Sequence, residues 1–208
     1  MMKLFAALCF SFLATAAAAQ DLAPDAMVKK ITNEVIEIVK QDRDIQAGNQ
    51  RKINELVDAK VLPHFDFRRM TALALGRNWP KANAEQQKAL TSEFRTLLVR
   101  TYSSALATYR NQVIEFKPLR AAAGETDVMV KTQVKQSGTE PVSIDYAMEK
   151  TPAGWKVYDV VVGGVSLVTN YRENFNGEIR DGGIDGLVKS LASKNRSLDP
   201  GQASAKPK

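Results

Sequence analysis

Residues 142–150 read VSIDYAMEK, and this stretch decides the fold. Its apolar side chains occupy every second position, at Val142, Ile144, Tyr146 and Met148. A period of two is typical of a β-strand, because successive side chains point to opposite faces of a sheet. The clean alternation predicts an antiparallel sheet that has one covered face and one face in water.

The same alternation continues on both sides of this stretch. The sequence predicts further strands over residues 113–119, 127–136 and 155–162. Gly138 and the run 152–154, which reads PAG, mark tight turns between consecutive strands. Short strands joined in this way form a meander, so we expect a four-stranded antiparallel sheet over about residues 113–162.

Apolar residues with helical spacing flank the predicted sheet. Before the sheet, this spacing predicts helices over about residues 25–42, 49–61, 65–75 and 84–109. After it, residues 166–195 predict two helices separated by the pair Gly182-Gly183. The fold class is therefore α+β, with a helical subdomain over about residues 25–110 and C-terminal helices over about 166–195. We expect the helices to pack on one face of the curved sheet and to enclose an apolar cavity.

The two ends of the chain differ from the middle. Residues 1–19 contain Lys3, an apolar run and the alanines 17–19 before Gln20, which is typical of a cleaved signal peptide. The apolar run is shorter than the roughly 20 residues that a membrane-spanning helix needs. Residues 20–195 then form one domain, and the polar residues 196–208 predict a disordered tail. An exported chain whose mature part lacks cysteine fits the periplasm, and we expect it to be soluble there.

Groups that carry catalysis or hold metals are scarce in this sequence. It contains one histidine and one cysteine, and Cys9 lies within the predicted signal peptide. A zinc site is therefore close to excluded. His64 lies near Asp66, but its place at a helix break indicates a capping or surface role rather than a general base. Asp145 and Asp159 could form an acid–base pair only if a strand register shifted, and we expect both to face solvent. The sequence thus predicts no enzyme, no metal and no cofactor.

The formal net charge of the chain is +6. A mild positive charge favours anionic surfaces such as lipid headgroups, although it also fits solubility alone. Nucleic acid is the usual alternative partner for a basic protein, but the predicted export argues against it. Composition and periodicity alone therefore predict an exported α+β domain without a specific ligand.

Two groups of motifs resemble a known family. The first comprises residues 74–79 (ALGRNW), 85–87 (EQQ) and 94–102 (FRTLLVRTY). The second comprises residues 164–168 (GVSLV), 170–172 (NYR), Phe175 and 183–188 (GIDGLV). Together they resemble the MlaC family, the periplasmic phospholipid-binding component of the Mla lipid-asymmetry ABC transport system, also called the toluene-tolerance family. The likeness extends over about residues 25–195, and it departs from the family at Asn78 and Pro80.

The resemblance implies a soluble periplasmic carrier that binds a phospholipid by its acyl chains. Such a carrier shuttles the lipid between the outer membrane and an inner-membrane ABC transporter, while the headgroup stays outside the cavity. The implied partners are an outer-membrane lipoprotein complex and the MCE-domain subunit of the transporter. The alternative is a periplasmic carrier or chaperone for lipoproteins or other hydrophobic ligands.

The expected lipid-binding residues follow from strand alternation and from the helices that cover the sheet. They are Leu75, Trp79, Leu98, Tyr102, Val130, Val134, Ile144, Tyr146, Met148, Val168, Tyr171 and Phe175. The alternative role for each of them is ordinary packing in the core.

Overall fold

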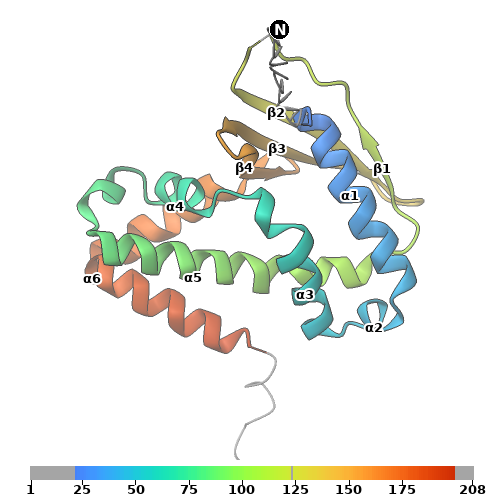
Figure 1. Cartoon of the computed structure of the whole chain (residues 1–208). Coiled ribbons are helices and arrows are strands. Elements are labelled where there is room, and N and C mark those ends of the chain that lie inside the picture. The colour runs from blue at the N-terminus through green and yellow to red at the C-terminus, as the bar shows by residue number, and fades with distance from the viewer. Residues whose placement is uncertain (1–21, 123, 200–208) are drawn as a thin grey trace, which may run out of the picture.

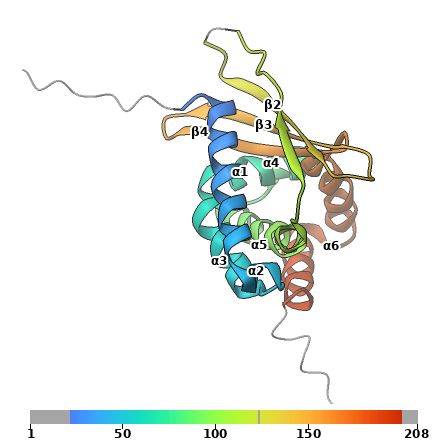
Figure 2. The same ribbon diagram turned by 90° about the vertical axis from the view of Figure 1, so that its right-hand side faces the viewer.

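The computed structural model describes residues 22–122 and 124–199. The predicted signal peptide and residues 200–208 of the predicted tail lie outside the described residues. In the described part, the elements follow the expected order of helices, then strands, then a helix (Figure 1). The sheet lies above α4 and α5, and α1 runs down one side of the molecule (Figure 2).

The sheet is an antiparallel meander with its strands in chain order. The strands are β1 (Val113–Phe116), β2 (Asp127–Lys135), β3 (Val142–Thr151), β4 (Gly154–Val162) and β5 (Val165–Ser166). All four predicted strands are confirmed, but β1 ends before the predicted residue 119. Pro118 has no backbone N–H to donate, which limits further pairing there. The sequence missed β5 because two residues carry no periodicity.

The strand register places the apolar residues of β2 and β3 on one face. Val130 pairs with Tyr146, and Val128 pairs with Met148. Paired residues of antiparallel strands project to the same side of a sheet, so these side chains form a common apolar surface. This is the covered face that the alternation predicted.

A β-bulge interrupts the pairing of β3 with β4. Met148 pairs with Val157, whereas the preceding Ala147 pairs with Asp159. Tyr158 is therefore an extra residue on β4. A bulge bends a strand and increases its twist, which contributes to the curvature of the sheet.

Helices account for most of the remaining described chain. The α-helices are α1 (Pro24–Gln41), α2 (Arg43–Gln46), α3 (Gln50–Lys60), α4 (Phe67–Leu75), α5 (Ala84–Tyr102) and α6 (Leu167–Ser197). Three 3₁₀ segments complete them, η1 (Leu62–His64), η2 (Gly76–Lys81) and η3 (Ser103–Thr108). The predicted helix over 84–109 is thus a capped α-helix, with Asn83 and Gln86 in a capping box, followed by the separate turn η3.

The C-terminal segment differs from the prediction of two separate helices and a tail from residue 196. α6 continues to Ser197, so the predicted disorder from residue 196 is wrong for Arg196 and Ser197. The predicted break lies at Gly183, whose φ of 69° and ψ of −174° are not helical. The break is therefore a kink within α6.

Three apolar clusters hold the elements together. One cluster packs α4, α5 and α6 around Phe94, and a second packs α1 against the apolar face of the sheet around Met148. A third packs the later turns of α1 against α2 and α3 around Ile53. α1 belongs to two of these clusters, so it joins the sheet to the helical part.

Candidate functional site

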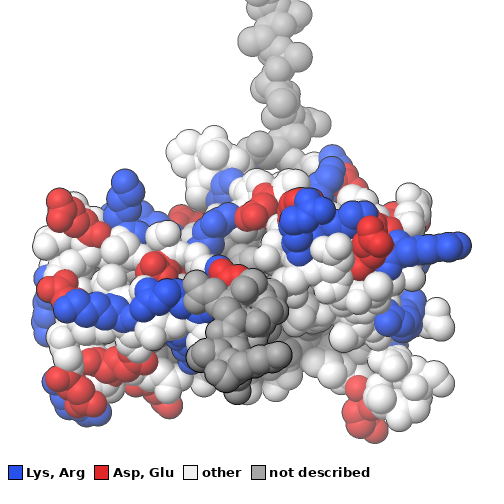
Figure 3. Space-filling view, turned by 90° about the horizontal axis from the view of Figure 1, so that it is seen from below, with Lys and Arg blue, Asp and Glu red and all other residues white. Residues whose placement is uncertain are grey.

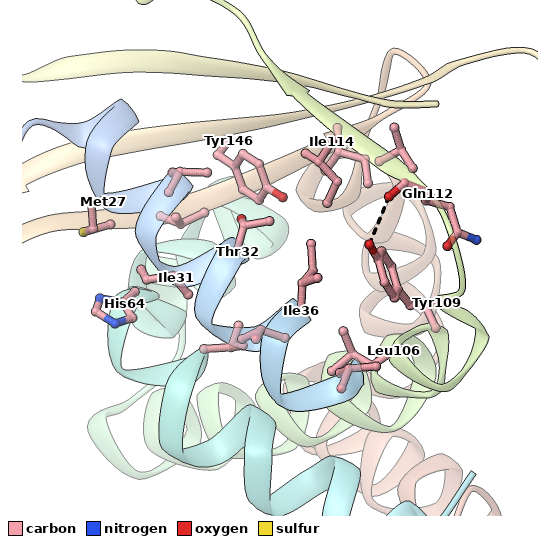
Figure 4. A pocket seen from close by; sticks show the side chains of 18 of the residues that line it. Met27, Ile31, Thr32, Ile36, His64, Leu106, Tyr109, Gln112, Ile114 and Tyr146 are labelled. Carbon is pink, nitrogen blue, oxygen red and sulfur yellow. Dashed lines mark hydrogen bonds between the residues drawn. The ribbon is translucent and has the colours of Figure 1, made fainter. Parts of the chain in front are cut away.

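An apolar cavity of about 380 Å³ lies between α1 and the sheet (Figure 4). It is lined by Met27, Val28, Ile31, Thr32, Val35, Ile36, Val39, Val61, His64, Phe65, Ala105, Leu106, Thr108, Tyr109, Gln112, Ile114, Val134, Ile144, Tyr146 and Val157. Most of these side chains are aliphatic or aromatic. The space therefore suits an apolar ligand, with polar contacts at only a few places.

One face of α1 forms the first wall of the cavity. Val28, Ile31, Val35 and Val39 recur at intervals of three and four residues, which places them in one stripe along the helix. In Figure 4, Ile31, Thr32 and Ile36 point from α1 into the space. Val28, at the start of the stripe, also packs against the sheet, whereas Val35 and Val39 also pack against α2 and α3.

The sheet forms the opposite wall. Ile114 of β1, Val134 of β2 and Ile144 of β3 project from neighbouring strands on the same face. Tyr146 reaches the same space, and burial raises the pKa of its phenol. The phenol is therefore neutral at physiological pH and adds no charge to the wall.

The two ends of the cavity carry polar side chains. Leu106 and Tyr109 border the end near η3, and the Tyr109 hydroxyl donates a hydrogen bond of 3.0 Å to the backbone oxygen of Gln112 (Figure 4). His64 lies at the other end, near Met27. Burial, followed by the nearby charge of Lys156, lowers the pKa of His64, so the imidazole is mostly neutral at pH 7.

Three of the sequence-predicted site residues line the cavity, namely Val134, Ile144 and Tyr146. Val130 and Met148 share their face of the sheet but lie in the packed cluster beside it, where they are 1% and 0% exposed. Cavity geometry therefore gives no support to lipid contact by these two residues.

The other predicted residues lie in the helical part of the molecule. Leu75, Leu98, Val168, Tyr171 and Phe175 are buried in the α4–α5–α6 cluster, and Trp79 packs against it. The ring of Phe94 meets Tyr171 and Phe175 edge-on, with centroids 4.9 and 5.2 Å away. Tyr102 is 43% exposed. Helices cover the other six of these residues, and the structure does not bring any of the seven to the cavity.

The sequence reasoning missed the wall that α1 provides. The apolar stripe of α1 is visible in the sequence as helical periodicity. Leu106, which borders the end of the cavity near η3, falls within the longer helix predicted over 84–109. Neither pattern indicates which partner a helix covers, since periodicity reports a buried face and not its neighbour. No local signal distinguished this stripe from those of α4 and α5.

The candidate catalytic groups have structural roles. Asp66 caps α4, accepting a hydrogen bond of 2.8 Å from the backbone N–H of Arg69. Asp159 pairs with Ala147 on the sheet face opposite to Tyr146, and it is partly rather than fully exposed. Its carboxylate accepts hydrogen bonds from Ser166 Oγ at 2.5 Å and from the backbone N–H of Val168 at 3.1 Å. Asp159 thereby anchors the start of α6.

The described residues contain no cluster of three or more histidine, cysteine, aspartate or glutamate side chains that could hold a metal ion. Among the helices of residues 22–122 and 124–199, none is long and apolar enough to cross a membrane. On the face seen in Figure 3, the Lys and Arg side chains are interspersed with Asp and Glu.

Known proteins resemble this chain in sequence and in fold. The chain matches the family described as MlaC protein over residues 29–193. It is 26% identical over 191 residues to the intermembrane phospholipid transport system binding protein MlaC of Haemophilus influenzae, covering 87% of this chain and 86% of the relative. It is also 26% identical over 184 residues to the toluene tolerance protein ttg2D of Pseudomonas putida, covering 85% of each chain.

A solved structure gives a closer comparison. The phospholipid-binding protein from Ralstonia solanacearum, solved in complex with a phospholipid, is 44% identical to this chain. The two folds superpose with a TM-score of 0.80, over 85% of this chain and 99% of the other. The α+β fold of a curved sheet with packed helices is thus shared with a protein that holds a lipid.

Proposed function

Because this chain belongs to the MlaC family, we propose that it is a soluble periplasmic carrier that binds a phospholipid by its acyl chains. The carrier shuttles the lipid between the outer membrane and an inner-membrane ABC transporter. Its proposed partners are an outer-membrane lipoprotein complex and the MCE-domain subunit of the transporter. The names of the relatives and the bound lipid of the Ralstonia protein support the ligand.

The apolar cavity carries this proposal. Its volume of about 380 Å³ lies within the range of about 300–1,000 Å³ that is common for small-molecule sites. Exposing an acyl chain to water costs about 0.8 kcal/mol per CH₂, so about 30 methylenes cost about 24 kcal/mol. A lipid therefore needs a covered apolar path to cross an aqueous compartment.

Release of the lipid sets the opposite requirement. A carrier must bind acyl chains about as well as a bilayer does, because a much tighter site would retain its cargo. The cavity walls are made of aliphatic side chains from α1 and β1–β4. The free energy of transferring an acyl chain from water to such walls is similar to that of transferring it to the membrane core. Chain binding by such walls depends little on the headgroup, and it requires no catalytic group.

The direct test is the lipid content of the protein. Full-length protein is expressed with export to the periplasm, purified without detergent and extracted with organic solvent. We expect about one two-chain phospholipid per protein by native mass spectrometry. A protein that carries no lipid would contradict the proposal, and bound lipoprotein or peptide would instead support a chaperone for those ligands.

A cavity-filling variant makes the test specific. Thr32 projects from α1 into the cavity, and Thr32→Trp should occupy the space of the acyl chains and lower the lipid content several-fold. Lys30 is exposed on the same helix, so Lys30→Trp provides a matched control that should retain its lipid. Thermal melting establishes that both variants are folded, and full lipid content in a folded Thr32→Trp variant would place the lipid elsewhere.

A further inference from the structure

Beside the apolar cavity lies a second hollow, of about 420 Å³, whose lining is more polar than the cavity walls. It lies between α1 and the segment 109–114 and is named the outlet. It shares Ile36, Tyr109, Gln112 and Ile114 with the apolar cavity, so the two spaces adjoin. The same four side chains therefore border both spaces.

The outlet carries more positive than negative charge. Lys40 of α1 and Arg110 line it, together with one carboxylate, that of Glu37. Lys40 Nζ lies 3.1 Å from Glu37 Oε1. Within the part of the chain that the structure describes, no carboxylate forms an ion pair with Arg110. Asn33 and Asn111 add exposed amide donors to the same hollow.

The chain around the outlet holds Arg110 in place. Its Nη1 donates hydrogen bonds of 2.7 Å to the backbone oxygens of Ala107 and Tyr109. Its backbone N–H donates to Gln112 Oε1 at 2.6 Å, and Gln112 Nε2 donates to Gln136 Oε1 at 3.1 Å. A guanidinium has five N–H donors in a planar fork, so donors remain for a ligand. Because the side chain is already positioned, less entropy is lost when an anion binds.

We propose that this outlet is a phosphate site, in which Arg110 and Lys40 bind the phosphodiester anion of a phospholipid while its acyl chains occupy the adjoining cavity. The inference rests on the proposed function, since the chains must fill the cavity to bring the phosphate to this opening. Ile36 and Tyr109 lie where the apolar walls give way to polar ones, which matches the glycerol region of the lipid. Groups beyond the phosphate extend into solvent, so the site selects for the phosphodiester and not for a particular alcohol.

The test compares two lipids with the same acyl chains, one that carries a phosphodiester headgroup and one that ends in a hydroxyl. Full-length protein is incubated with phosphatidylcholine vesicles that contain diacylglycerol with the same acyl chains, and bound lipids are quantified by mass spectrometry. We expect the wild type to enrich the phospholipid about fivefold to tenfold over diacylglycerol, as suits two exposed charge contacts. The double variant Lys40→Gln/Arg110→Gln should bring this ratio close to the vesicle composition while still binding both lipids.

A matched control removes the same charge elsewhere. Arg77 and Lys88 are exposed and lie outside both hollows, so Arg77→Gln/Lys88→Gln should keep the wild-type ratio. The inference is overturned if the wild type shows no preference, or if the Lys40/Arg110 variant retains it. If the wild-type protein binds neither lipid, the result would refute the proposed carrier function, and the phosphate site with it.

A free anion could supply the same chemistry. Calorimetric titration with inorganic phosphate distinguishes this source, because a lipid site gains most of its affinity from the acyl chains. We expect no saturable binding of inorganic phosphate by wild-type protein. Saturable binding that disappears in the Lys40→Gln/Arg110→Gln variant would assign the site to a free phosphate and overturn the headgroup assignment.

Discussion

Met148 and Ile144 lie on the same face of β3, yet their surroundings differ. Met148 is completely buried in the cluster that joins α1 to the sheet. Ile144 is only partly buried, and it borders the cavity. Two residues that the sequence treats as equivalent therefore have different consequences when they are changed.

A charge at each of these positions separates packing from ligand binding. Met148→Glu should destabilise the fold by several kcal/mol, because a buried and unpaired carboxylate loses its hydration without compensation. Ile144→Glu should fold, since water in an empty cavity can reach the carboxylate, but its lipid content should fall strongly. Urea denaturation and lipid extraction check both variants. A Met148→Glu variant as stable as wild type would show that this position is not tightly packed.

At the scale of elements, the kink in α6 depends on one glycine. Gly183 has φ of 69° and ψ of −174°, a conformation that is essentially restricted to glycine. Its neighbour Gly182 lies within the same helix without a positive φ. A Cβ at either position would meet no heavy atom within 4 Å. Backbone conformation therefore distinguishes the two glycines.

Alanine at these two positions should have opposite effects. Gly183→Ala should destabilise the protein by about 1–3 kcal/mol, because alanine must adopt a conformation that its Cβ disfavours. Gly182→Ala should stabilise it by about 0.4–1 kcal/mol, since it restricts the unfolded chain at a helical position. Chemical denaturation of the two variants measures both changes. Equal effects at the two positions would argue against a conformational origin for the kink.

At the scale of the whole molecule, Arg69 connects the helical part with the sheet. From α4, it forms ion pairs with Asp127 of β2, at 2.9 Å, and with Glu149 of β3. Its guanidinium also lies 3.5 Å from the ring centre of Tyr158, the extra residue of the bulge. The Tyr158 hydroxyl donates a hydrogen bond of 2.6 Å to Asp127. Burial, followed by this hydrogen bond, raises the pKa of Tyr158 to about 12.

Removing this arginine should weaken the connection between the two parts. Arg69→Met retains much of the side-chain volume but leaves two carboxylates without their cation. We therefore expect the free energy of unfolding to fall by about 1–3 kcal/mol. Arg68→Met is the matched control, because Arg68 is exposed and forms no ion pair within residues 22–122 and 124–199; its guanidinium lies 5.6 Å from the centre of the Trp79 ring. Urea denaturation at neutral pH measures both. Equal stability of the two variants would contradict a connecting role for Arg69.

The sequence by itself determined the order and type of most elements. Strand alternation identified four of the strands, and helical spacing indicated where α3 and α5 begin, at the helix ends that Asn49 and Asn83 cap. These features depend on neighbouring residues, through side-chain direction and hydrogen bonds to nearby backbone. Motifs over residues 74–102 and 164–188 also indicated the family correctly.

Only the tertiary structure decided which apolar stripes meet each other and which leave a space. Val134, Ile144 and Tyr146 border the cavity, while Leu98 and Phe175 fill a packed helical cluster. All five have similar local patterns, because periodicity marks a buried face without naming its partner. A cavity arises from distant elements that pack without filling the volume between them. Its wall from α1 could therefore be recognised only when residues far apart in the chain were seen together.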